Sequence, residues 1–372
     1  MDPNVIKLAM GAGGPSGPEY KLYAWGVNGF GQLGLGDTTN RSSPVQVGAL
    51  TTWSNVAGGS YHTIATKTDG TLWTWGYNNF GQLGLGDTTD RSSPVQVGAL
   101  TTWRKVSCGY FHTIATKTDG TLWTWGVNGF GQLGLGDTTN RSSPVQVGLL
   151  TTWSNVACGS YHTIATKTDG TLWAWGRNNT GQLGLGNTTN RSSPVQVGAL
   201  TTWSNISAVN LHNLAIKTDG TLWAWGSNGY GRLGDGTITT RTSPVQIGAL
   251  TTWSSVGSGG SHSTAVKTDG TLWSWGKNFS GQLGLGDTVD RSSPVQVGSL
   301  TSWDKTSCGF EHAFAIKTDG TLWAWGYNGG GQLGIGLSGP AAKRSSPVQV
   351  GSLTSWSSVK AGKVHTLGIT NK

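Results

Sequence analysis

Short runs of alternating apolar and polar residues recur along the whole chain, and Gly, Asp or Asn separates them. In one stretch these runs cover residues 44–47, 53–57, 62–67 and 71–75, and Asp69-Gly70 lies between the last two. Alternation with a period of two indicates half-buried strands, and Asp-Gly between two such runs indicates a hairpin. The pattern therefore predicts an all-β chain with tight turns and lacks the 3.6-residue period of a helical solenoid.

The pattern repeats every 50 residues. Residues 51–100 and 101–150 are identical at 40 of 50 positions, and only the last repeat is longer, by three residues within 337–343. Four short strands in about 50 residues are typical of a propeller blade. We therefore expect a seven-bladed β-propeller with four-stranded blades, because Trp-Gly occurs seven times, at Trp25, Trp75, Trp125, Trp175, Trp225, Trp275 and Trp325.

The two ends of the chain carry complementary parts of one repeat. Tyr20–Gly26 contains the Trp-Gly strand without a preceding His strand, whereas residues 364–370 contain the His strand without a following Trp-Gly strand. Pairing the N-terminal strand with the C-terminal blade would close the ring and remove its open edges. We expect residues 20–372 to form this single propeller and residues 1–19, which are rich in Gly and Pro, to form a flexible leader or docking peptide.

The repeat carries a motif that one copy shows as Gly59-x-x-His62, Asp69-Gly70 and Trp75-Gly76-x-Asn78-x-x-Gly81-Gln82-Leu83-Gly84. This motif resembles the repeat of the regulator of chromosome condensation family, whose fold is a seven-bladed β-propeller. The resemblance covers residues 20–372, and we expect a bacteriophage or bacterial member. It implies the fold more strongly than the function, because such propellers serve as exchange factors, scaffolds, ligase-associated domains and modules of bacterial or viral surface proteins.

The composition of 61 Gly and 20 Trp, with 11% charged residues, is that of a turn-rich β protein, not a disordered one. The net charge of +8 comes largely from repeated framework positions, because seven of the ten arginines occupy one equivalent position. Asp37 precedes Arg41 by four residues and predicts an ion pair that braces the loop, whereas Asn187 and Leu337 leave Arg191 and Arg344 without this partner. This distribution argues against a nucleic-acid partner.

Several candidate chemistries have plainer structural interpretations. Gly29-x-Gly31-x-x-Gly34 matches a dinucleotide fingerprint, but no helix follows it, so we expect turn-forming glycines. The seven histidines are equivalent positions one blade apart, which predicts a ring of structural hydrogen bonds. No Ser, Cys or carboxylate pair is distinguished from its counterparts in other repeats. We therefore expect no enzyme, no cofactor and no metal site.

Cys108, Cys158 and Cys308 are odd in number and far apart, which predicts buried free thiols. No signal peptide or transmembrane segment is recognisable, so we expect no membrane insertion and a virion or cytoplasmic location. Trp73 and Trp75 point to the same face of their strand and predict packing between blades. Stacking of Trp on sugar rings remains open as an alternative.

The repeats differ from one another mainly after each Trp-Gly and before each His, where a binding protein usually keeps its specificity. Aromatic residues at these positions are most frequent in the first three repeats, and Tyr and Phe suit a contact surface. We predict that the partner-binding loops present Phe30, Tyr61, Tyr77, Phe80, Tyr110, Phe111, Phe130, Tyr161, Tyr230, Phe310 and Tyr327.

The leading hypothesis is a non-enzymatic binding or structural protein that displays its loops to a macromolecular or glycan partner. Its most concrete version is a virion component, such as a phage tail, fibre or capsid-decorating protein. The expected partner is a protein, of a virion or a scaffold, or a surface glycan. A multivalent lectin is the first alternative. A guanine-nucleotide exchange factor or chromatin-associated scaffold is a weaker one, because few acidic residues lie outside the repeated positions.

Overall fold

The computed structural model describes residues 18–371, so nearly all of the leader expected at residues 1–19 lies outside the described part. Apart from one short 3-10 turn, η1 (Pro340–Ala342), its regular elements are strands. They are β1 (Tyr20–Gly26), β2 (Arg41–Gln46), β3 (Trp53–Gly58), β4 (His62–Lys67), β5 (Leu72–Gly76), β6 (Arg91–Gln96), β7 (Trp103–Cys108), β8 (His112–Lys117), β9 (Leu122–Gly126), β10 (Arg141–Gln146), β11 (Trp153–Cys158), β12 (His162–Lys167), β13 (Leu172–Gly176), β14 (Arg191–Gln196), β15 (Trp203–Ala208), β16 (His212–Lys217), β17 (Leu222–Gly226), β18 (Arg241–Gln246), β19 (Trp253–Ser258), β20 (His262–Lys267), β21 (Leu272–Gly276), β22 (Arg291–Gln296), β23 (Trp303–Cys308), β24 (His312–Lys317), β25 (Leu322–Gly326), β26 (Arg344–Gln349), β27 (Trp356–Ala361) and β28 (His365–Asn371).

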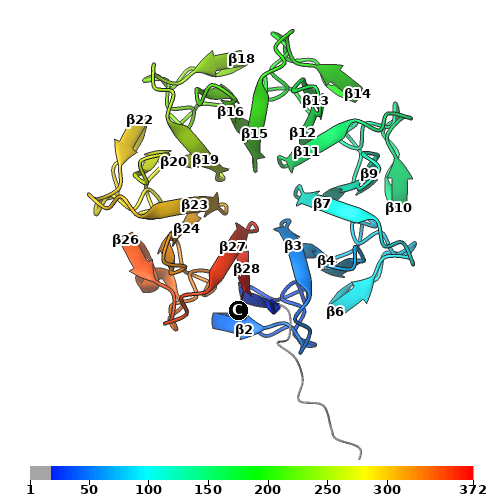
Figure 1. Ribbon diagram of the computed structural model, residues 1–372, viewed down its shortest axis with the longest axis horizontal. Helices are drawn as coiled ribbons and strands as arrows, with labels where there is room; N and C mark the ends of the chain where they lie inside the picture. The colour runs from blue at the N-terminus through cyan, green and yellow to red at the C-terminus, as the bar shows by residue number, and fades with distance from the viewer. Residues whose placement is uncertain (1–17, 372) are drawn as a thin grey trace, which may run out of the picture.

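These strands form seven four-stranded antiparallel sheets, which are the blades of a propeller. We number the blades by their Trp-Gly strand: blade 1 is β2-β1-β28-β27, blade 2 is β3-β4-β5-β6, and the numbering continues to blade 7, β23-β24-β25-β26. Figure 1 shows one strand of each sheet, such as β3, β7 and β27, around the central axis and the strand at the opposite edge of the sheet, such as β6, β10 and β2, at the rim. The predicted all-β, seven-bladed fold is confirmed.

The ring closes through the two ends of the chain, as predicted. All seven residues of β1 pair with β28, from Tyr20 opposite Asn371 to Gly26 opposite His365. Figure 1 shows that this blade joins the blue N-terminal strands to the red C-terminal ones. Both β1 and β28 therefore have a hydrogen-bonded neighbour strand on each side. Blade 1 has four strands, like the other blades.

Tryptophans form the core between blades, which confirms their predicted packing role. The Trp75 indole is fully buried, and its Nε1 donates a 3.0 Å hydrogen bond to the Gln32 carbonyl of the preceding blade. Gly34 lies under this ring, where a Cβ atom would stand 2.7 Å from Nε1. The Gly29-Gly31-Gly34 motif therefore serves the turn and close packing, as the absence of a following helix indicated.

The outer strands begin earlier than expected. The sequence predicted residues 44–47, whereas β2 spans Arg41–Gln46. The register shifts between Gly26 opposite Arg41 and Ala24 opposite Val45, so an irregular step holds Pro44 at the sheet edge. Proline lacks an N–H and is tolerated on edge strands, which explains why the strand extends across it.

The three cysteines lie at the ends of inner strands and are free thiols, as predicted. Cys158 and Cys308 are buried, and burial raises the pKa of each thiol to about 12. Cys108 is only half-buried, so the predicted burial is wrong for this one thiol. These thiols therefore stay protonated and act as small apolar side chains.

Candidate functional site

The variable loops lie at one end of the blades. His62 pairs with Gly76, so the loop before β4 and the loop after β5 share one face, whereas the Asp-Gly turn between Thr66 and Leu72 lies on the other. We call the first the upper face and the second the lower face. The same arrangement repeats in blades 3 to 7, whereas in blade 1 the ends of β1 and β28 lie where the other blades have the Asp-Gly turn.

Beneath the upper face, the seven histidines form a buried ring around the axis. His62 Nε2 lies 3.1 Å from Thr113 Oγ1 of the next blade, and Thr113 donates its hydroxyl hydrogen to the Gln82 carbonyl at 2.8 Å. His62 Nε2 must therefore carry the hydrogen of this bond. Burial lowers the pKa of His62 to about 3 and keeps the ring neutral. Six of the seven histidines connect neighbouring blades in this way, which confirms their predicted structural role.

One hydrogen bond of the histidine ring is missing, at His262. Both nitrogens of His262 lack a hydrogen-bond partner among the described residues, because Ala313 stands where other blades place a hydroxyl or amide. Ala313→Thr should raise the free energy of unfolding by about 1 kcal/mol, since the new hydroxyl would meet His262 and the Gln282 carbonyl.

Urea denaturation followed by Trp fluorescence measures this effect. Ala315→Ser is the matched control, because it adds a hydroxyl to the same buried strand at a position where other blades carry Ala or Gly. It should lower the stability. An Ala313→Thr protein no more stable than the wild type would show that the missing hydrogen bond costs nothing.

The arginine ring at the rim is mostly neutralised by its own loops. Asp37, Asp87, Asp137 and Asp287 pair with the arginine four residues later at 2.5–2.6 Å, as predicted. Within residues 18–371, the Arg191 and Arg344 guanidinium groups bond only to backbone carbonyls. These two are thus the arginines that the sequence singled out as unpaired.

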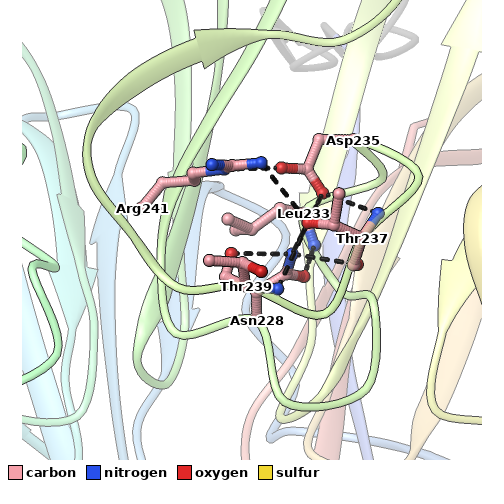
Figure 2. Close-up of polar contacts among 6 residues, drawn as sticks. All are labelled: Asn228, Leu233, Asp235, Thr237, Thr239 and Arg241. Atoms are coloured by element: carbon pink, nitrogen blue, oxygen red, sulfur yellow. Dashed lines mark hydrogen bonds and ion pairs between the residues drawn. The ribbon is translucent and has the colours of Figure 1, made fainter.

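Blade 5 forms the ion pair from a residue that the sequence analysis missed. Thr237 replaces the usual acid, and Asp235, two residues earlier, bonds Arg241 Nε at 2.7 Å. Figure 2 shows Asp235 also held by Thr237 and by the Asn228 amide, at 2.8 Å and 3.0 Å. Comparing the Leu-Gly-Asp order of other repeats with the Asp-Gly-Thr order here would have revealed the exchange.

Nine of the eleven predicted site residues meet on the upper face in one network. The Phe30 ring centroid lies 4.8 Å from that of Tyr77, edge to face, and 5.2 Å from that of Tyr61, in a tilted arrangement. Phe80 continues the network at 5.5 Å from Phe111. We call this the aromatic patch; it comprises Phe30, Tyr61, Tyr77, Phe80, Tyr110, Phe111, Phe130, Tyr161 and Phe310.

The patch spans blades 1 to 4 and reaches across the axis to blade 7. Tyr110 of blade 3 contacts both blade 4 and blade 7. Its ring centroid lies 5.8 Å from that of Tyr161 and 6.5 Å from that of Phe310. Burial raises the pKa of Tyr110 to about 12. Only Phe30 and Phe80 are more than a third exposed, at 39% and 37%. The rings therefore form a preformed surface and do not project singly into solvent.

Two cations, which the sequence analysis did not assign to the site, contact the patch. The Lys363 ammonium lies 4.8 Å from the Tyr110 ring centroid and 5.4 Å from that of Phe310. The Arg177 guanidinium lies 5.1 Å from the Phe130 ring. Cations at these distances are attracted to ring faces, so the patch is apolar with positive charge at its centre and border.

The structure does not bring Tyr230 and Tyr327 into the patch. Tyr230 is 44% exposed over blade 5, beside Arg232 and Lys277. The Tyr327 side chain lies over its own loop, where a Cβ atom on Gly329 would clash with the Tyr327 hydroxyl.

Near the lower face, a lysine ammonium covers the ring of Trp73 and of each equivalent tryptophan in blades 3 to 7. The Lys67 ammonium lies 3.6 Å from the Trp73 ring centroid, and the same contact recurs in the next five blades. Among the described residues, no cluster of three His, Cys, Asp or Glu side chains is placed to hold a metal ion. No helix in residues 18–371 is long and apolar enough to cross a membrane.

The family model of the regulator of chromosome condensation (RCC1) repeat matches the chain seven times, at residues 21–66, 69–116, 119–166, 169–216, 219–266, 269–316 and 319–369. A second model of this repeat matches six segments between residues 53 and 332. Together the matches cover almost the whole propeller.

Solved structures show the same fold at low sequence identity. Human WBSCR16 is 23% identical with a TM-score of 0.84, over 94% of this chain and 98% of its own. Yeast RCC1 (Prp20) bound to Kap60 is 19% identical with a TM-score of 0.84, over 96% and 90%. Prp20p from Saccharomyces cerevisiae, described with its binding to Gsp1p and histones, is 20% identical with a TM-score of 0.82, over 95% and 92%. By its repeats and its fold, this chain belongs to the RCC1 repeat family.

Proposed function

We propose that this chain is a non-enzymatic binding protein and that the aromatic patch contacts a protein partner. The observation that carries the proposal is the single network of nine aromatic side chains from five blades on the upper face. Rings already fixed against one another lose little conformational entropy on binding, and Tyr and Phe supply large contact areas.

The geometry favours a protein over a glycan. Sugar stacking needs an open ring face, whereas Trp75 is fully buried and Lys67 covers Trp73. The patch rings pack edge to face or tilted against one another, which covers ring faces that a sugar would need. The binding of Kap60, Gsp1p and histones described for Prp20 also supports a protein as the class of partner. Lys363 and Arg177 favour a segment that combines apolar and acidic side chains.

The repeats supply variants that should keep the fold. Thr180 occupies in blade 4 the place of Phe30 and Phe80, and its N–H makes the same bond to the nearby glutamine. The double variant Phe30→Thr/Phe80→Thr should therefore melt like the wild type but lose binding by roughly tenfold or more, the effect of removing hot-spot rings.

Affinity capture from the producing cells, followed by titration of the purified partner, measures this loss. Phe279→Asn is the matched control, because Phe279 is 71% exposed outside the patch and other repeats carry Asn there. It should bind like the wild type. Equal binding by the double variant would contradict the proposal, and capture of glycans that is insensitive to the double variant would favour a lectin.

The finer form of the proposal is that the partner belongs to a virion and that this chain is a tail, fibre or capsid-decorating component. Its support is a chain with only 11% charged residues and loop ion pairs that neutralise most of the arginine ring. Density-gradient fractionation of the producing culture tests it. The chain should co-sediment with particles, and recovery only in the soluble fraction would contradict this form while leaving the protein-binding proposal intact.

A further inference from the structure

The seven inner strands enclose a channel along the propeller axis. Its middle is a cavity of about 160 Å³, which is roughly five water volumes. It widens to about 510 Å³ at the lower face, between Asn55, Asn155 and Asn205. Toward the upper face it narrows to about 30 Å³, where Tyr110, Phe310 and Lys363 converge. A small solute would therefore enter from the lower face, away from the aromatic patch.

One residue breaks the sevenfold pattern of the channel wall. At the position of Lys360, the other six inner strands carry only Ala, Ser or Gly, which are Ala57, Ser107, Ala157, Ser207, Gly257 and Ser307. Lys360 lines both the middle of the channel and its lower mouth. Within residues 18–371 its ammonium has neither a hydrogen bond nor an ion pair, and no Asp or Glu lines the channel. The Lys360 side chain is exposed in the channel, so its ammonium group is open to an anion that enters from the lower mouth.

Two more lysines, Lys105 and Lys305, lie near Lys360. Lys105 lines the lower mouth and bonds the Asn155 side chain, and Lys305 bonds the Ser357 carbonyl at 3.0 Å. Asp304 lies 3.6 Å from Lys305 at the exposed rim. The protein atoms of the channel wall, and then the positive charge of Lys305, lower the pKa of Lys360. The mouth is thus cationic, with one rim carboxylate.

The wall also supplies neutral donors. Ser107, Ser207 and Ser307 lie at the level of Lys360, and each Oγ accepts a backbone N–H from the next blade at 3.0–3.2 Å. Their hydroxyl hydrogens make no bond among the described residues and can turn toward the channel. Serine hydroxyls and ammonium groups together are typical ligands of tetrahedral oxyanions.

We propose that the channel binds a small phosphate-bearing molecule, with the phosphate group beside Lys360 and the three serine hydroxyls. Three ammonium groups match a multiply charged anion better than a monocarboxylate, which would leave most of the positive charge uncompensated. The binding site faces the lower mouth and is independent of the upper-face partner.

Isothermal titration of the full chain with inorganic phosphate and with pyrophosphate, at constant ionic strength, tests the proposal. Both should bind, pyrophosphate more tightly, and chloride should not compete at equal ionic strength. Lys360→Ala should weaken binding by about tenfold or more, because it removes the central charge. Alanine occupies this position in two other blades, so the variant should fold.

Lys343→Ala is the control of equal charge, because Lys343 lies near Phe279, outside the channel. It should bind phosphate like the wild type. Thermal melting gives a second readout, since phosphate should raise the melting temperature of the wild type but not of Lys360→Ala. Absence of binding at millimolar phosphate, or equal weakening by both variants, would overturn the proposal.

Discussion

Acidification below pH 6 is expected to unfold the propeller through its histidine ring. Burial lowers the pKa of His62, His112 and His365 to about 3 and that of His162 to about 4. The unfolded chain titrates near the ordinary histidine value of about 6.5. Between these values the unfolded state binds protons that the folded state does not, so stability falls as the pH falls.

The size of the effect follows from the number of histidines. All seven are fully buried, and the pKa values of His212, His262 and His312 are lowered in the same way. Each such group costs about 1.4 kcal/mol per pH unit below its unfolded pKa, so seven cost on the order of 10 kcal/mol per unit. Because domains are stable by only about 5–15 kcal/mol, we expect a midpoint between about pH 4 and 6.

Urea unfolding from pH 8 to pH 4, followed by Trp fluorescence, measures the slope. Protonation of the turn carboxylates affects stability only at lower pH. The Thr71 hydroxyl and N–H, for example, keep the pKa of Asp69 below its ordinary value. His262→Gln is the informative variant, because the His262 side chain has no hydrogen-bond partner in the described chain. Its loss should lower the dependence of the unfolding free energy on pH by about one seventh. Stability unchanged down to pH 4.5 would contradict the account.

The repeat made the architecture predictable from the sequence. A 50-residue period with an Asp-Gly hairpin fixes the strand number, and the split repeat at the chain ends predicts the β1–β28 pair. Sevenfold equivalence also identified the structural histidines, because residues one blade apart cannot converge on one ion.

Contacts between blades were less predictable. The partners of the aromatic rings depend on blade rotation, which strand periodicity does not encode, so the meeting of Tyr110 with Phe310 across the axis needed the structure. In the sequence, nothing distinguishes Lys360 from a surface lysine. Only the arrangement of the blades shows that it lies at the axis of the propeller. In contrast, the missing partner of His262 was visible in the sequence, as Ala313 among hydroxyl and amide residues.

Deletion of Tyr20–Gly26 should abolish stable folding. The strand buries Leu22, Ala24 and Trp25 completely, and Trp25 Nε1 donates a 3.0 Å hydrogen bond to the Gln332 carbonyl of blade 7. Burial of Leu and Trp contributes about 1.5–3 kcal/mol each or more, before any β-ladder bond is counted. The loss is comparable to the whole stability of a domain, about 5–15 kcal/mol.

The deletion also opens two sheet edges, because β2 loses its only strand neighbour and β28 loses one of two. Exposed edges pair between chains, so the truncated protein should aggregate, as size-exclusion chromatography and thermal melting would show. Lys21→Ala is the control on the same strand, because it removes only a surface ion pair with Glu19 and should melt like the wild type. A peptide of residues 20–26, which supplies the missing β1, should restore a soluble ring when added during refolding. A truncated chain that melts like the intact one would mean that contacts between blades hold the ring without the shared sheet.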